Sequence, residues 1–199
     1  MTSTLLVYLH GFRSSPNSTK AVMTGEAVRA LSTADNRYEW YCPQLLASPK
    51  ESMDMVVKHI DEAHFDRLVI IGSSLGGFYT NYLAEKYQCK GIALNPAVYA
   101  ARELEPHVGM MTAYDSEEPF DFKAEYIDQL RALQVNAISN PERYFLIAAK
   151  GDELLDWKEM AAFYPYANIV FYSLHNFLGT IRTFISSGFI LSMFLNDDV

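Results

Sequence analysis

The sequence predicts a three-layer α/β fold, in which helices cover both faces of a mostly parallel sheet of about six strands. Short apolar runs alternate with longer amphipathic runs along the 199 residues. The apolar runs are continuous, as in "RLVIIG" and "RYFLIAA", which is typical of strands buried on both faces. Right-handed crossovers between such strands give a doubly wound sheet.

The order of elements follows from these runs. A helix is expected at "SPKESMDMVVKHI", because Ser48 can cap it, Pro49 suits its first position and Glu51 completes a capping box. A second helix is expected at "GGFYTNYLAEKY". The expected strands are Leu5–Leu9, Tyr38–Cys42, Leu68–Gly72, Gly91–Asn95, Tyr144–Ala148 and Asn168–Tyr172.

One interval is longer than this alternation requires. The stretch between Asn95 and Tyr144 is about twice as long as a single crossover helix needs. We therefore expect one domain over residues 1–199, with an insertion at about 99–141 that forms a cap or lid over one end of the sheet. Two ordinary surface helices are the alternative.

Composition excludes several classes of protein. A net charge of −8 argues against a nucleic-acid binder, which normally presents a basic face. Cys42 and Cys89 form neither a metal motif nor a disulfide framework, and we expect both to be buried apolar residues of a cytoplasmic protein. We expect no signal peptide, because the first apolar run "TLLVYLH" is too short for one, and the run "FISSGFILSMFL" is too short to span a membrane.

The stretch "VIIGSSLGGFYT" contains a candidate nucleophile. Ser74 is the central residue of G-x-S-x-G, with Gly72 and Gly76 two positions away on either side. In a nucleophile elbow the serine occupies a strained turn between strand and helix, and larger residues at the two glycine positions would collide with that turn. A dinucleotide fingerprint and a P-loop lack required residues here, whereas a tight turn without chemistry stays open.

A serine hydroxyl needs a base and an orienting acid to react. In this arrangement the acid follows a later strand, and "KGDELLDW" offers Asp152 and Asp156. Asp152 comes directly after the strand, so we assign it to the chemistry. Asp156 opens "DWKE" like a helix N-cap with Glu159 as its box partner.

The base should follow the next strand, where "NIVFYSLHNF" contains His175. The remaining four histidines precede the acid, and none of them fits this position. The oxyanion hole should come from the backbone N–H groups of Leu75, directly after the serine, and of Phe12 in the loop after the first strand. Gly11 lets this loop approach the serine, and His10 is expected to fix the loop by hydrogen bonds.

These residues resemble the YqiA-like family of small bacterial esterases, which have the α/β-hydrolase fold. The matching segments are "YLHGFRSSPNSTKA", "GSSLGGFY", "LNPAV" and "KGDELLDW", in the expected order. The resemblance implies activity on short acyl esters or acyl-CoA thioesters without a metal or organic cofactor, and again a triad of Ser74, Asp152 and His175. The family usually has Gly-Gly-Asp/Asn before the histidine, whereas this chain has "YSL".

The sequence thus predicts a serine hydrolase that acts on a small-molecule ester or thioester through an acyl-enzyme. The altered histidine loop favours an alternative, a non-catalytic binding protein, and a peptidase or C–C hydrolase would use the same triad.

Arg13 and Lys20 are either contacts for an anionic substrate group or solvated surface charges. Met110, Met111, Tyr114 and Phe120 are either an acyl pocket or core, and the apolar C-terminal run is either a cover for the core or a homodimer contact.

Overall fold

The computed structural model describes residues 2–33, 35–114 and 117–173. Its main sheet has the strand order β2-β1-β3-β4-β7-β8, and every neighbouring pair is parallel. This confirms the predicted α/β class. The strands are β1 (Thr2–Leu9), β2 (Asn36–Tyr41), β3 (Arg67–Ser73), β4 (Lys90–Leu94), β7 (Tyr144–Lys150) and β8 (Asn168–Ser173).

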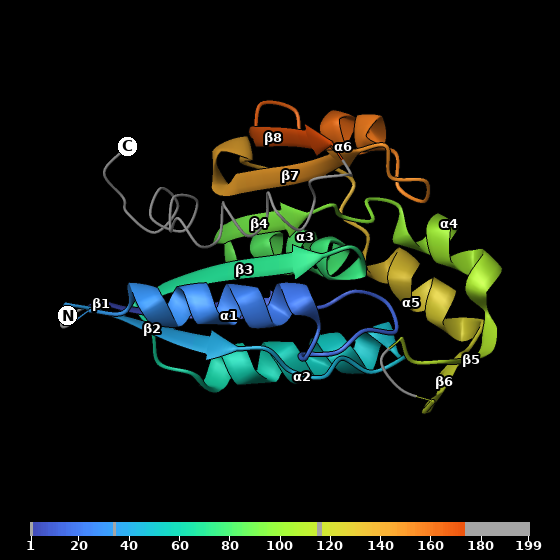
Figure 1. Cartoon of the computed structure of the whole chain (residues 1–199), viewed down its shortest axis with the longest axis horizontal. Coiled ribbons are helices and arrows are strands. Elements are labelled where there is room, and N and C mark those ends of the chain that lie inside the picture. The colour runs from blue at the N-terminus through green and yellow to red at the C-terminus, as the bar shows by residue number, and fades with distance from the viewer. Residues whose placement is uncertain (1, 34, 115–116, 174–199) are drawn as a thin grey trace.

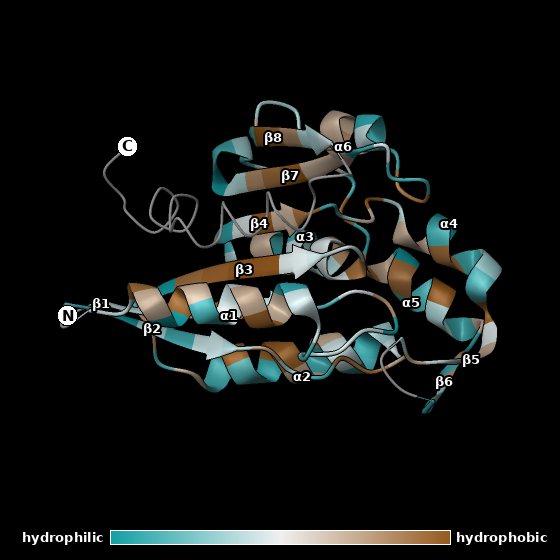
Figure 2. Ribbon diagram, viewed as in Figure 1, coloured by the Kyte–Doolittle hydropathy of each residue, from teal (hydrophilic) through white to brown (hydrophobic). Residues whose placement is uncertain are grey.

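Helices cover both faces of this sheet (Figure 1). In the described part of the chain, α1 (Thr19–Leu31) lies on one face. The opposite face carries α2 (Pro49–Glu62), α3 (Leu75–Tyr87) and α6 (Trp157–Phe163). Because successive strand residues point to opposite faces, Leu6 and Tyr8 of β1 pack toward α1, whereas Leu5, Val7 and Leu9 pack toward α2 and α3. In Figure 2 the strands β3, β7 and β8 are mainly brown, whereas the edge strand β2 is teal to white.

The interval between β4 and β7 contains several short elements at the carboxyl ends of the main strands (Figure 1). The amphipathic stretch "FKAEYIDQLRAL" contains the helix α5. The hairpin of β5 and β6 was not expected, because each of its strands has only four residues. The elements are α4 (Ala100–Leu104), η1 (Glu105–His107), β5 (Gly109–Thr112), β6 (Pro119–Phe122), α5 (Glu125–Leu133) and η2 (Pro141–Arg143).

Local signals in the sequence explain where the helices start. The Ser48 side chain accepts a hydrogen bond from the Glu51 N–H at the start of α2, and Pro49 occupies the first turn, as predicted.

Cys42 and Cys89 are free and half-buried, and burial raises the pKa of their thiols to about 11 and about 12. Both thiols therefore stay protonated at neutral pH.

No helix among the described residues is long and apolar enough to cross a bilayer. Nor do they contain a group of three or more His, Cys, Asp or Glu side chains that could hold a metal ion. The apolar C-terminal run at 184–195 lies outside the described residues.

Candidate active site

The turn from β3 into α3 holds Ser74 in a strained conformation. Its φ of 56° and ψ of −120° lie outside the regions that L-residues normally adopt. The Ser74 N–H donates to the Leu94 carbonyl at 3.1 Å, and the Ser74 carbonyl accepts from the Ala97 N–H at 3.0 Å. Strain of this kind costs about 1–3 kcal/mol and persists only where the surrounding structure enforces it. The turn leaves Ser74 lining a cavity at the carboxyl ends of the strands.

The glycines around Ser74 have a steric reason. A Cβ atom at Gly72 would lie 2.0 Å from the Gly76 carbonyl oxygen, and one at Gly76 would lie 1.9 Å from the Leu9 carbonyl oxygen. No side chain fits at such distances, so β1, β3 and α3 can pack this closely only with glycine at both positions. Gly11 differs, because its Cβ would lie 3.8 Å from Ser74 Oγ, in ordinary contact.

Asp152 lies in the loop after β7 and also lines the cavity. Its Oδ1 accepts hydrogen bonds from the N–H groups of Leu154 at 2.9 Å and Leu155 at 3.0 Å. Its Oδ2 accepts a hydrogen bond from Asn95 Nδ2 at 2.8 Å. These bonds fix the carboxylate on the cavity wall.

Asn95 is a residue that the sequence analysis did not single out. Two hydrogen bonds fix its own position: its Oδ1 accepts from the Ala149 N–H at 2.9 Å, and its N–H donates to the Ile147 carbonyl at 2.7 Å. Its backbone φ is 46°. Asparagine tolerates this left-handed conformation better than most residues. The available signal was an asparagine directly after a buried strand, in "LNPAV".

The second candidate acid has a different role. Asp156 accepts a hydrogen bond from the Lys158 N–H at 2.9 Å and is the N-cap of α6, which confirms its assignment as a capping residue. The expected box partner Glu159 instead forms an ion pair with Arg102.

The predicted base, His175, lies outside the described residues. His10 is buried, its Nε2 accepts from the Leu45 N–H at 2.9 Å, and its Nδ1 lies 2.9 Å from the Gly11 carbonyl oxygen. Because both ring nitrogens are engaged, His10 holds the loop after β1 and is not placed to take a proton from Ser74. His107 lines the cavity, with its ring centroid 6.1 Å from that of Phe12.

The cavity has a volume of about 410 Å³ and collects most of the predicted site residues. Among the described residues, the amides of Phe12 and Leu75 donate to no acceptor, so both are available to a ligand. The candidate residues of the sequence analysis that line it are Gly11, Phe12, Arg13, Lys20, Ser74, Leu75, Tyr114 and Asp152.

The loop after β1 is held by the β5–β6 hairpin. The Phe12 ring makes edge contacts with Phe120 and Phe122, at centroid distances of 5.2 and 4.9 Å. Arg13 donates from Nε to the Thr112 carbonyl, and its guanidinium lies 4.4 Å from the centroid of the Tyr114 ring. The half-buried Arg13 is therefore a link between loop and hairpin, and it also lines the cavity.

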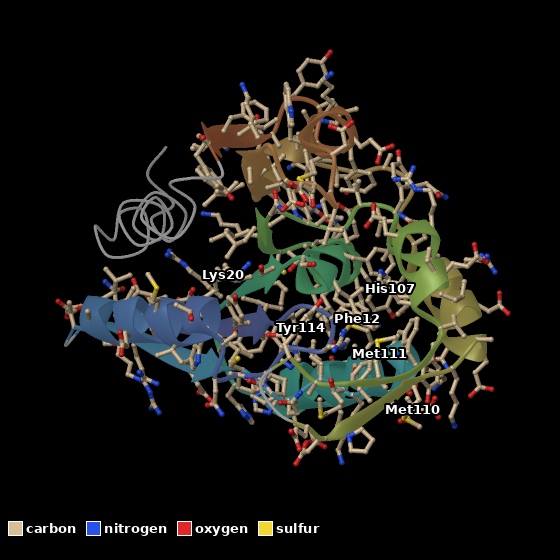
Figure 3. The ribbon with its side chains drawn as sticks, turned by 45° about the vertical axis from the view of Figure 1, so that its right-hand side comes forward. Phe12, Lys20, His107, Met110, Met111 and Tyr114 are labelled. Atoms are coloured by element: carbon tan, nitrogen blue, oxygen red, sulfur yellow. The ribbon has the colours of Figure 1, made fainter. Side chains whose placement is uncertain are left out.

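The four side chains considered for an acyl pocket lie at different places in the structure. Tyr114 lines the cavity, and Phe120 borders a smaller cleft beside Phe12. Met111 packs against the core, whereas Met110 is 69% exposed and points away from Phe12 and His107 (Figure 3).

The pKa values of two further ionisable groups on the cavity wall are shifted. Burial lowers the pKa of Lys20 to about 8, and the nearby negative charge of Asp152 opposes this shift only in part. Burial raises the pKa of Glu103, whose Oε2 is buried without a hydrogen-bond partner among the described residues.

Comparison with known proteins supports both the family resemblance and the fold. The family described as "Uncharacterised protein family (UPF0227)" matches residues 5–185. UPF0227 proteins of Yersinia pseudotuberculosis and Yersinia pestis are each 28% identical to the chain over 173 residues, which cover 83% of this chain and 86% of each relative.

Solved structures resemble the chain more in fold than in sequence. Est1E from Butyrivibrio proteoclasticus, solved with ferulic acid bound, has a TM-score of 0.71 at 15% identity and covers 97% of this chain and 90% of its own. Mouse alpha/beta hydrolase domain-containing protein 10 has a TM-score of 0.69 at 15% identity, with 96% and 90% covered. The thioesterase domain from the curacin biosynthetic pathway has a TM-score of 0.56 at 12% identity, with 96% and 91% covered. These likenesses confirm the α/β-hydrolase fold.

Proposed function

Because this chain belongs to the UPF0227 family and has the α/β-hydrolase fold, we propose that it is a serine hydrolase that cleaves carboxylic esters or thioesters. The reacting groups in this proposal are Ser74, His175 and Asp152. The names of the structural neighbours, which include the esterase domain of a Rhodothermus marinus protein and a thioesterase domain, support the choice of substrate class. The fold itself is compatible with many activities, so the argument depends on the site.

The observation that carries the proposal is the strained Ser74 beside a fixed carboxylate. A serine that serves only as a turn residue gains nothing from a φ of 56° in a cavity wall. Here the strained turn lies in the same cavity as Asp152, whose two oxygens accept three hydrogen bonds. This combination favours a nucleophile with its orienting acid over a tight turn without chemistry.

The reaction then follows from the roles of these groups. His175 takes the proton of Ser74 Oγ as the oxygen attacks the ester or thioester carbonyl, and Asp152 stabilises the imidazolium that forms. The Phe12 and Leu75 N–H groups donate to the oxyanion. His175 passes the proton to the leaving alcohol or thiol, and later activates the water that hydrolyses the acyl-enzyme.

The insertion at about residues 99–141 is the proposed cap. Leu104 and His107 come from it and line the cavity, so substrate choice would depend on this segment. A cap that covers Ser74 would also exclude water from the developing oxyanion.

A panel of p-nitrophenyl acetate, p-nitrophenyl butyrate and butyryl-CoA tests the proposal. We expect wild type to hydrolyse at least one of them, and Ser74→Ala, Asp152→Asn and His175→Ala to lose about a thousandfold or more in kcat. His64→Ala, on the exposed segment after α2, is the matched control and should keep wild-type activity. If the folded wild type hydrolyses none of these compounds, or Ser74→Ala keeps its activity, the proposal is wrong and a binding role takes its place.

A further inference from the structure

We infer that the cavity contains an anion subsite, formed by Tyr8, Ser18, Lys20 and Ser73 on its α1 side, that binds a carboxylate or phosphate group of the substrate. All four residues line the same cavity as Ser74. The inference rests on the proposed function, because it names the class of ester that Ser74 would attack.

Two buried hydroxyls point to a missing ligand. Tyr8 and Ser73 stand at the carboxyl ends of β1 and β3, on strand positions that face α1. Their side chains are 0% and 3% exposed, yet within the described chain neither hydroxyl has a hydrogen-bond partner. Leaving a buried hydroxyl unpaired costs about 1–3 kcal/mol, so an acceptor that reaches either hydroxyl from the cavity would remove that penalty.

The start of α1 adds positive potential to the same place. Lys20 lies in the first turn of this 13-residue helix, and the side chain of the N-cap residue Ser18 bonds none of the helix N–H groups. Helix N-termini and ammonium groups both favour anions. Figure 3 shows Lys20 on the side of α1, apart from Phe12 and His107, which lie together near α4.

The chemistry of these groups selects an anionic oxygen group over a neutral one. The ammonium and the helix amides can only donate, and burial raises the pKa of Tyr8, which keeps its phenol a donor. Asp152, whose negative charge acts on Lys20, directs its oxygens toward Asn95 and the loop amides of Leu154 and Leu155.

The lining also includes Leu75, Leu104 and Leu155 beside Phe12, together with Glu103 and His107 of the α4 segment. A substrate would therefore place its carboxylate or phosphate toward α1 and the rest of the ester among these side chains.

Matched pairs of charged and neutral esters test this subsite. Ethyl hydrogen glutarate is compared with ethyl pentanoate, and 2-acetoxyethyl phosphate with 2-acetoxyethanol, so that the two pairs distinguish a carboxylate from a phosphate. We expect the charged member of at least one pair to have a kcat/KM about tenfold higher or more, as one charge-assisted hydrogen bond can supply. In Lys20→Met, Tyr8→Phe and Ser73→Ala this ratio should fall toward one.

Lys58→Met, at an exposed position of α2, is the matched control and should leave the ratio unchanged. The inference is overturned if wild type shows no preference for the charged member of either pair, or if Lys20→Met keeps the preference. Neither result would contradict the proposed function, provided that the neutral esters are hydrolysed.

A binding measurement keeps the two proposals separable. Calorimetry with Ser74→Ala, which cannot turn the ester over, measures the affinity for ethyl hydrogen glutarate and 2-acetoxyethyl phosphate directly. Binding of either ester that is lost in the Ser74→Ala/Lys20→Met double variant supports the anion subsite even if wild type hydrolyses no ester. Absence of binding to both esters contradicts it.

Discussion

Among single residues, Asn95 has the most direct influence on the proposed acid. Its amide donates to Asp152 Oδ2 while its carbonyl oxygen is held by the Ala149 N–H. Asn95 is thus a positioning residue, which acts through Asp152 and not on the substrate. Asn95→Asp keeps the size and the bond from Ala149 but places a second carboxylate beside Asp152.

We expect Asn95→Asp to lower kcat about tenfold to a hundredfold at neutral pH, with little change in KM, because a hydrogen bond to a charged group is replaced by repulsion. The added negative charge also favours the protonated form of the proposed base. The acidic limb of the pH–rate profile should therefore move to higher pH. A purely structural role would lower the Tm and leave the position of that limb unchanged.

The lowered pKa of Lys20 predicts that the preference for a charged over a neutral ester depends on pH. Because burial lowers its pKa to about 8, the ammonium is present below that pH and is lost above it. The preference for a charged over a neutral ester should therefore be high at about pH 6.5 and low at about pH 9. The triad is common to both esters and cancels in the ratio.

The other charged or titratable groups on the cavity wall are Tyr8, Arg13, Glu103, His107, Tyr114 and Asp152, and the Lys20→Arg variant separates their effects. Arginine stays charged throughout this range, so Lys20→Arg should keep the same ratio at both pH values. A ratio that falls equally in Lys20→Arg would assign the pH dependence to one of the other groups.

Among the elements, the β5–β6 hairpin controls the loop that carries the proposed oxyanion donor. Arg13 joins the two by its bond to the Thr112 carbonyl, and the Tyr114 N–H donates back to the Arg13 carbonyl at 2.9 Å. We expect Arg13→Met to lower kcat about tenfold with little change in KM, because a displaced Phe12 amide would weaken binding of the oxyanion only in the transition state.

Steady-state kinetics with a neutral ester check this expectation, and Arg37→Met, on exposed β2, is the control. A raised KM with an unchanged kcat would contradict it, since that result would make Arg13 a substrate contact.

The elements show which parts of the structure a sequence can predict. The six long strands were predicted to within a few residues. The four inner strands have continuous apolar runs that are buried on both faces, whereas the edge strands β2 and β8 are only partly buried. The hairpin was missed because its four-residue strands are only partly buried, so their pattern is too short and too mixed to read. Ser74 and Asp152 could be located from strand ends and local motifs. The role of Asn95 could not, because it depends on β4 and β7 ending side by side.

At the scale of the whole molecule, fold and site place different demands on glycine. A Cβ at Gly76 would lie 1.9 Å from the Leu9 carbonyl oxygen, in the centre of the sheet–helix contact. Gly76→Ala should therefore lose about 3 kcal/mol of stability or more, measured by urea unfolding. Gly11→Ala makes only ordinary contacts and should unfold close to wild type, yet it places a methyl group 3.8 Å from Ser74 Oγ and should reduce ester hydrolysis.

The pair separates a folding defect from a site defect. Wild-type stability in Gly76→Ala would contradict the close packing of α3 on β1. Full activity in a stable Gly11→Ala would show that the approach to Ser74 is wider than the cavity indicates.

The account depends most on Ser74 being an activated nucleophile, and labelling with a fluorophosphonate probe tests this directly. Intact-mass spectrometry followed by peptide mapping would be applied to wild type, Ser74→Ala and His175→Ala. The account predicts one adduct per chain on Ser74 in wild type and none in either variant, because an unactivated serine reacts too slowly to be labelled. A folded wild type that resists labelling, or an adduct on a residue other than Ser74, would contradict it.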